Sequence, residues 1–176
     1  MTLKNLLVCL LAYPLCGTPL LMAQSTKQVT VNASVAEMLS LTVDATSVTL
    51  AFVAADYDVT TGLATKTAVK ATTFSVSANR AWKLTVRPGD QYFTFTPVGT
   101  GVQDPRKPVS TLSTRTGVAA YAPFSGVTDI PVATGTGGGY SKPGNIIPVD
   151  YQMTSALATD PPGAYVLTLT YTLAAQ

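Results

Sequence analysis

The sequence contains no histidine and few charged residues, and these shortages exclude several classes of protein. Of its 176 residues 11% are charged, whereas about a quarter is usual for a globular chain. Lys and Arg together number 11 and Asp and Glu 9, which gives a net charge of +2. This balance excludes a nucleic-acid binder that works by positive charge. Without histidine the chain lacks the most common general base and the commonest metal ligand.

The N-terminal segment has the composition of an export signal. Residues 1–23 begin with one basic residue, Lys4, continue with an apolar stretch and end in a small residue, which is the order of a secretory signal peptide. Pro14 and Pro19 interrupt the apolar stretch, and a membrane-spanning helix needs roughly 20 consecutive apolar residues. We therefore expect a cleaved signal peptide at residues 1–23 and no membrane span in the mature chain, residues 24–176.

Cysteine is confined to this same segment, where Cys9 and Cys16 are the only two. The mature chain is therefore expected to have no disulfide, no thiolate nucleophile and no cysteine-bound metal. An exported domain without disulfides depends on its own hydrophobic core. A chain of ~150 residues is long enough for this, because it buries most of the surface that its unfolded form exposes. The sequence predicts one such domain at residues 24–176.

Apolar and polar residues alternate with a period of two along most of the mature chain. This pattern is typical of antiparallel strands that place one face on a core and the other in water. Many of the 28 threonines fall on the polar face, where Thr keeps a high strand propensity without adding apolar surface. The alternating segments are residues 29–35, 39–43, 48–52, 74–78, 82–86, 93–95, 147–153 and 165–173.

Turn-forming residues separate the alternating segments, including Pro-Gly pairs at 88–89, 143–144 and 162–163. No long stretch has the period of a helix. We therefore predict an all-β fold, a single antiparallel Ig-like β-sandwich of about 8–10 short strands. Long mid-chain loops are expected at residues 99–107 and 134–145, and glycines make the second of these a candidate mobile loop.

Motifs for catalysis and metal binding are missing. A glycosidase needs two carboxylates placed across a bond, whereas the mature chain has one Glu, Glu37, and eight Asp, several of them in turns. Asp56 and Asp58 have the i, i+2 spacing of some calcium loops, but an Asp-rich turn explains them equally well. We predict no catalytic, cofactor or metal site, and a protein that is not an enzyme.

Four tyrosines are candidate binding residues at the surface. Tyr92 lies on the polar face of its segment, and Tyr57, Tyr121 and Tyr140 lie in or near loops. A tyrosine ring supplies contact area and its hydroxyl supplies a hydrogen bond. Isolated aromatic residues are also ordinary at protein surfaces. These residues leave a carbohydrate-binding module as one alternative for the function.

Two short motifs resemble those of the WxL-type wall-binding domain of Gram-positive bacteria. The first is Trp82-x-Leu84, and the second, Tyr171-x-Leu173, closes the chain with Tyr171 where that family has Trp. The resemblance covers residues 38–174 and implies a β-sandwich that attaches non-covalently to peptidoglycan. The alternation itself places all four side chains in a core, as it does for the tryptophan of many sandwiches.

The closing strand also resembles those of fimbrial subunits from secreted pili, although the cysteine pair usual in that family is absent. Such subunits often have an N-terminal alternating segment that completes a neighbour's sandwich. Residues 28–35 have this alternation. The segment can pair within its own domain, or it can add a strand to an exposed sheet edge of another protein. Both alternatives remain open from the sequence.

The sequence thus predicts an exported, non-enzymatic protein with a structural, adhesive or wall-associated role in a bacterial envelope. We expect it to be secreted, at the cell surface or periplasmic. The expected partners are cell-wall glycan, other surface proteins or further copies of the chain, and not nucleic acid. The first alternative is a pilus-type subunit that assembles by strand exchange through its N-terminal segment, and the second is a carbohydrate-binding module.

Overall fold

The computed structural model describes residues 27–176. The predicted signal peptide, the two cysteines and the predicted domain boundary at residue 24 lie outside the described residues. The chain divides into one unit that ends at Ser34 and a second unit, Val35–Gln176. Within residues 27–176, no helix is long and apolar enough to cross a membrane.

In the described part of the chain, ten strands form antiparallel sheets of five, three and two strands. Their orders are β1-β2-β8-β5-β6, β10-β3-β7 and β4-β9. The prediction of an all-β antiparallel sandwich is confirmed. The strands are β1 (Leu39–Val43), β2 (Leu63–Ala78), β3 (Trp82–Pro88), β4 (Thr94–Pro97), β5 (Leu112–Thr116), β6 (Ala122–Pro123), β7 (Ile130–Gly135), β8 (Ile146–Ala156), β9 (Gly163–Val166) and β10 (Leu169–Ala175), with short 3-10 turns at η1 (Ala54–Asp56) and η2 (Val109–Thr111).

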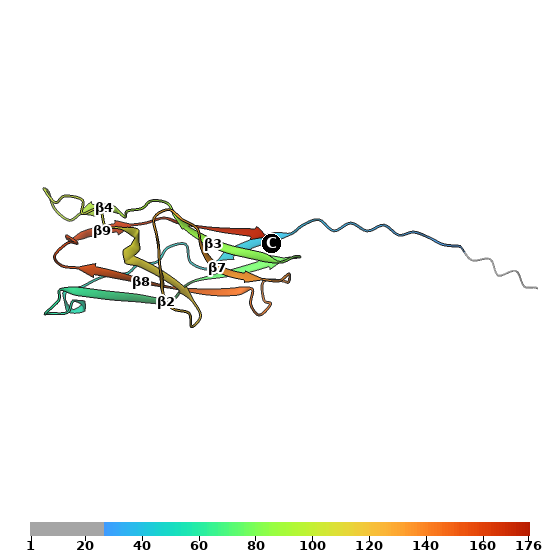
Figure 1. Cartoon of the computed structure of the whole chain (residues 1–176), viewed down its shortest axis with the longest axis horizontal. Helices are drawn as coiled ribbons and strands as arrows, with labels where there is room; N and C mark the ends of the chain where they lie inside the picture. The colour runs from blue at the N-terminus through green and yellow to red at the C-terminus, as the bar shows by residue number, and fades with distance from the viewer. Residues whose placement is uncertain (1–26) are drawn as a thin grey trace, which may run out of the picture. The chain divides into compact units, whose positions relative to one another are not determined.

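The sheets pack face to face around one hydrophobic core. Figure 1 shows β2 and β8 along one side of the sandwich and β3, β4 and β9 along the other. Alternation within β3 explains the core, because Trp82, Leu84 and Val86 are fully buried, while Lys83 between them and Arg87 after them are exposed. The opposite layer supplies buried residues of the same kind: Phe74, Val76, Ile147, Val149, Tyr151 and Met153.

The long ladder between β2 and β8 contains a bulge, where residues 69–71 of β2 lie opposite Asp150 alone. Lys70 has a positive φ of 48°, and its N–H donates to Asp150 Oδ1 at 2.7 Å. Arg115 Nε donates to the other carboxylate oxygen at 2.8 Å. The carboxylate thus supplies an acceptor for the Lys70 N–H, which the bulge takes out of the ladder.

Two predicted strands are absent from the structure. Residues 28–35 and 48–52 have the alternating pattern but belong to no strand. Leu50 and Phe52 pack against the core from an irregular segment instead. Alternation describes which side chains are apolar, whereas a strand also needs backbone hydrogen bonds to a neighbouring strand, which these two segments do not have. The strands are also not all short, since β2 has 16 residues.

The glycine-rich segment, residues 136–145, is fastened to the sandwich. Asn145 is 1% exposed, and its Nδ2 donates to Val76 O at 3.0 Å and to Gly138 O at 3.2 Å. Gly138 also forms an isolated β-bridge with Ala78. One buried amide therefore ties the loop to the end of β2, which the glycine content alone does not reveal.

Candidate functional site

β10 is an edge strand whose core-facing side chains are only partly buried. It pairs with β3 along its whole length, and no strand in the described part of the chain lies on its other side. Leu169, Tyr171 and Leu173 pack against the core but remain partly exposed. Their partners in β3, Leu84 and Val86, are fully buried. The free edge of β10 therefore combines unpaired backbone groups with incompletely covered apolar side chains.

β1 borders the same part of the sandwich. It is the edge strand of the five-stranded sheet and contacts β10. Its apolar residues pair with buried residues of β2, yet Leu39 and Leu41 are only partly buried and Val43 is exposed, at 40%. We define the β1–β10 edge as these two strands with the six core-facing residues Leu39, Leu41, Val43, Leu169, Tyr171 and Leu173.

Residues 28–35 have the alternating pattern of a strand but belong to no strand. Val29, Val31 and Val35 are 85%, 84% and 85% exposed, and Thr30 and Asn32 between them are exposed as well. The segment contains no charged residue. A row of exposed valines at strand spacing is a candidate interaction surface.

The chain enters the sandwich beside the end of β10. Asn79 Nδ2 donates to Ala36 O at 2.7 Å. The guanidinium of Arg80 donates to the backbone carbonyl of Gln176 at 2.7 Å and to Glu37 Oε2 at 3.1 Å. Ala36 and Glu37, near the start of the second unit, and Gln176 therefore all bond to the turn between β2 and β3.

The two Trp-x-Leu-like motifs lie in paired strands. In the register of β3 and β10, Leu84 is opposite Leu173 and Val86 is opposite Tyr171. Trp82 is fully buried, and its Nε1 donates to Thr136 O at 3.2 Å. Trp82 and Leu84 therefore have no surface to offer a ligand, whereas Tyr171 and Leu173 face the β1–β10 edge.

Two of the candidate tyrosines carry an arginine on one ring face. Arg106 lies 4.5 Å from the ring centroid of Tyr92, and Arg115 lies 4.3 Å from that of Tyr121. Both contacts are cation–π interactions, and they cover one of the faces on which a sugar would stack. The Tyr121 hydroxyl is buried and has no hydrogen-bond partner among the described residues.

The other two candidate tyrosines bond to neighbouring strands. The Tyr57 hydroxyl lies 3.0 Å from Ser155 Oγ in β8, and the Tyr140 hydroxyl bonds to Ser40 Oγ in β1. The four candidates thus contact three different strands and one loop, and they form no common aromatic platform. This arrangement gives little support to a carbohydrate-binding module.

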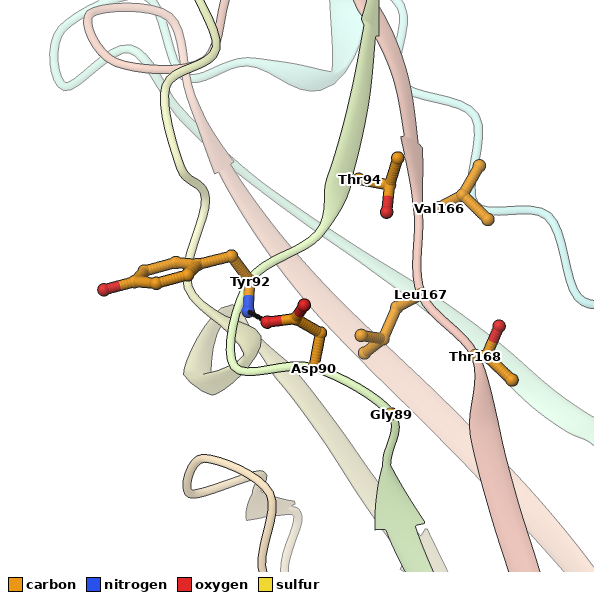
Figure 2. Close-up of a pocket in the computed structure, with 7 residues that line it drawn as sticks. All are labelled: Gly89, Asp90, Tyr92, Thr94, Val166, Leu167 and Thr168. Carbon is orange, nitrogen blue, oxygen red and sulfur yellow. Dashed lines mark hydrogen bonds between the residues drawn. The ribbon is translucent and has the colours of Figure 1, made fainter.

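An opening of about 270 Å³ lies where the ladder of β3 and β10 gives way to that of β4 and β9. Residues 89–93 lie opposite only residues 167–168 there. In Figure 2 the ring of Tyr92 points away from Leu167 and Thr168. The Asp90 carboxylate accepts a hydrogen bond from the Tyr92 N–H at 3.2 Å. Asp90 carries the one carboxylate among the residues that line this opening, and this carboxylate is already hydrogen-bonded within its own turn.

A buried ion pair joins Lys107 to Asp160, with side chains 3% and 8% exposed. Asp160 also accepts hydrogen bonds from Ser155 Oγ at 2.9 Å and from the Ala156 N–H at 3.0 Å. Burial acts to raise the pKa of Asp160, but the hydrogen bonds, foremost that from Lys107, outweigh it and lower the pKa. The carboxylate therefore stays ionised and fastens two loops together. The two residues are 53 positions apart, so the sequence gives no sign that they form a pair.

Asp56 and Asp58, which have the spacing of some calcium loops, instead stabilise a contact to β2 and a local turn. Asp56 forms an ion pair with Lys66 at 2.9 Å, and Asp58 accepts hydrogen bonds from the N–H and hydroxyl of Thr61 at 2.7 and 2.9 Å. Among residues 27–176, no three His, Cys, Asp or Glu side chains are grouped to hold a metal ion.

Comparison with known proteins gives no relative: no family model matches the chain, and no curated protein matches it. Any inference about function therefore rests on features of the chain itself. These are an antiparallel sandwich, the β1–β10 edge with its partly covered apolar residues, and an N-terminal segment with exposed valines at strand spacing.

Proposed function

We propose that the protein is an exported, non-enzymatic structural subunit of a bacterial envelope, and that it assembles by adding residues 28–35 as a strand to the sheet of another protein. One observation carries the proposal: Val29, Val31 and Val35 are at least 84% exposed in a segment that has strand alternation. Burying a valine side chain contributes about 1.5 kcal/mol or more. Main-chain hydrogen bonds to a free edge add to this, and alternate side chains supply specificity.

Other features agree with a structural role. The leader-like residues 1–23 support export. The carboxylates of Asp150 and Asp160 are held by hydrogen bonds and ion pairs within the fold, which suits a stable building block better than a reaction centre. The burial of Trp82 and Leu84 favours a core role for this motif over a wall-binding one.

The test is the native mass of residues 24–176 by light scattering, compared between two variants that each add one negative charge. Val31→Asp places the charge on the valine face of the segment, and Asn32→Asp places it on the opposite face. We expect wild type and Asn32→Asp to form large or ladder-like species and Val31→Asp to remain a folded monomer. A monomeric wild type, or an unchanged mass for Val31→Asp, would contradict the proposal.

A further inference from the structure

A second opening shares Asp90, Tyr92 and Thr94 with the opening of about 270 Å³ and extends along β4 to the loop that follows it. This groove has a volume of about 440 Å³ and is lined by residues 90–95 together with Asp104 and Arg106. The volume falls within the range of small-ligand sites. None of the lining residues belongs to residues 28–35 or to the β1–β10 edge, so a ligand in the groove contacts neither of these surfaces.

Main-chain hydrogen bonds anchor the two segments that line the groove. The Phe93 N–H donates to Lys107 O at 2.9 Å, and the Val109 N–H donates to Gln91 O at 3.0 Å. The Lys107 side chain is 3% exposed and forms its ion pair with Asp160. Both segments are therefore fixed in the fold before a ligand arrives, and binding does not have to include the cost of ordering them.

Arg106 brings to the groove a positive charge that the fold does not neutralise. Its guanidinium lies 4.5 Å from the ring centroid of Tyr92. Within residues 27–176 this guanidinium forms no ion pair and donates no hydrogen bond. The Arg106 backbone has a positive φ of 49°, which a residue with a side chain rarely adopts, and its N–H donates to Asp104 Oδ1 at 2.8 Å. The turn thus fixes the arginine while its side-chain donors stay unused.

Two carboxylates of the same groove also lack a cationic partner. Asp104 uses Oδ1 for the Arg106 N–H, and Asp90 uses Oδ1 for the Tyr92 N–H at 3.2 Å. In the part of the chain that the structure describes, neither carboxylate forms an ion pair, and the second oxygen of each accepts no hydrogen bond. The groove therefore holds one positive and two negative groups whose partners the fold does not supply.

We propose that this groove binds a small zwitterion, a molecule such as an amino acid or a dipeptide that carries both a free carboxylate and a free ammonium. The planar guanidinium of Arg106 fits the ligand's carboxylate through two parallel hydrogen bonds. The unused oxygens of Asp90 and Asp104 accept hydrogen bonds from the ligand's ammonium. A ligand with charge of one sign would pair with only some of these groups and would meet like charge at the others, which disfavours it.

The test is a titration of residues 24–176 carrying Val31→Asp, a chain that the proposed function expects to be monomeric and in which the groove is unchanged. Glycine and glycylglycine are the zwitterionic probes, and backbone amide shifts in NMR spectra report binding. We expect saturable shifts in residues 90–95 and 104–106. N-acetylglycine lacks the ammonium and glycinamide lacks the carboxylate. Each should bind at least about tenfold more weakly, the loss expected for one charge-assisted hydrogen bond.

Two variants with matched controls test the assigned residues. Arg106→Gln removes the guanidinium, and Asp104→Asn removes a charge while its side-chain oxygen still accepts the Arg106 N–H. We expect each to weaken the binding of glycylglycine at least about tenfold. Arg87→Gln and Asp129→Asn remove exposed charges outside the groove and should bind like the parent chain. Fluorescence of the buried Trp82 reports whether each variant is folded.

The outcomes separate this site from the proposed function. Equal binding of glycylglycine and one of its singly charged analogues would overturn the zwitterion, and an Arg106→Gln chain that binds like its parent would overturn the assigned donor. The absence of saturable shifts with both zwitterions would overturn the site itself. None of these results changes the expected mass of the assembly, and a monomeric wild type would overturn strand addition while the groove still binds. The tighter of the two zwitterions assigns the ligand to amino acids or to peptides.

Discussion

The hydroxyl oxygens of Tyr151 in β8 and Tyr171 in β10 lie 2.5 Å apart and connect the two layers of the sandwich. The ring of Tyr171 also packs on Phe74 of β2, with ring centroids 4.1 Å apart. Burial raises the pKa of both tyrosines, so both hydroxyls stay protonated and one donates to the other. This pair fixes β10 against the opposite sheet.

Removing one hydroxyl of this pair should destabilise the fold. Tyr171→Phe leaves the buried Tyr151 hydroxyl without its partner, at a cost of about 1–3 kcal/mol in the free energy of unfolding. Urea denaturation followed by Trp82 fluorescence measures the change. The double variant with Tyr151→Phe should lose less than the sum of the two single changes, because the second removes the orphaned group. Additive losses would show that the two hydroxyls do not interact.

Stability should fall at alkaline pH, in part because of Tyr165. Burial and the nearby charge of Asp160 raise the pKa of Tyr165 to about 12, whereas an unfolded tyrosine ionises near about 10. The unfolded chain therefore releases this proton first, and the free energy of unfolding decreases as the pH rises from about 10 towards 12. Denaturation between these pH values measures the slope. Tyr165→Phe should reduce it, and an unchanged slope would contradict the assignment.

Gly135 is required by the position of Trp82. A Cβ at Gly135 would overlap the indole ring, and the ring is fully buried with nowhere to move. Gly135→Ala should cost about 1–3 kcal/mol, as is usual for overpacking. Gly139→Ala is the control, since a Cβ there meets nothing within 4 Å. Equal melting temperatures for the two variants would show that the core yields at Trp82.

The buried ion pair predicts a loss of stability in acid. Because the folded-state pKa of Asp160 is lowered from 3.8, the pair contributes stability above about pH 4 that is lost as the pH falls through the folded pKa. Lys107→Met should cost about 3–5 kcal/mol at neutral pH, since it leaves a buried carboxylate without its cation. Asp160→Asn should make the free energy of unfolding depend less on pH in acid. Wild-type acid sensitivity in Asp160→Asn would assign the effect to other carboxylates.

The alternation of apolar and polar residues along the sequence was enough to predict some of the strands. The apolar rows of β3 and β10 follow from the alternation of residues 82–86 and 165–173, and both strands form. The pattern failed at residues 48–52, where Leu50 and Phe52 reach the core without pairing, because sheet edges are assigned by the whole fold. The link between Lys107 and Asp160 has no local signal at all. The β1–β10 edge could not be predicted either, since an edge is defined by which strand is missing beside it.

The edge strands β6 and β7 contain proline, whereas β10 contains none. This difference restricts where another strand can be added to the sandwich. Pro123 and Pro131 protect two of its edges, so strand addition is directed to the β1–β10 edge, where neither strand contains proline. An assembly built in this way has two unlike ends, one with an unfilled edge and the other with an unused tail. A molecule that offers a suitable strand but has no open edge would therefore terminate growth at one end only, and the number of such terminators would set the length of the assembly.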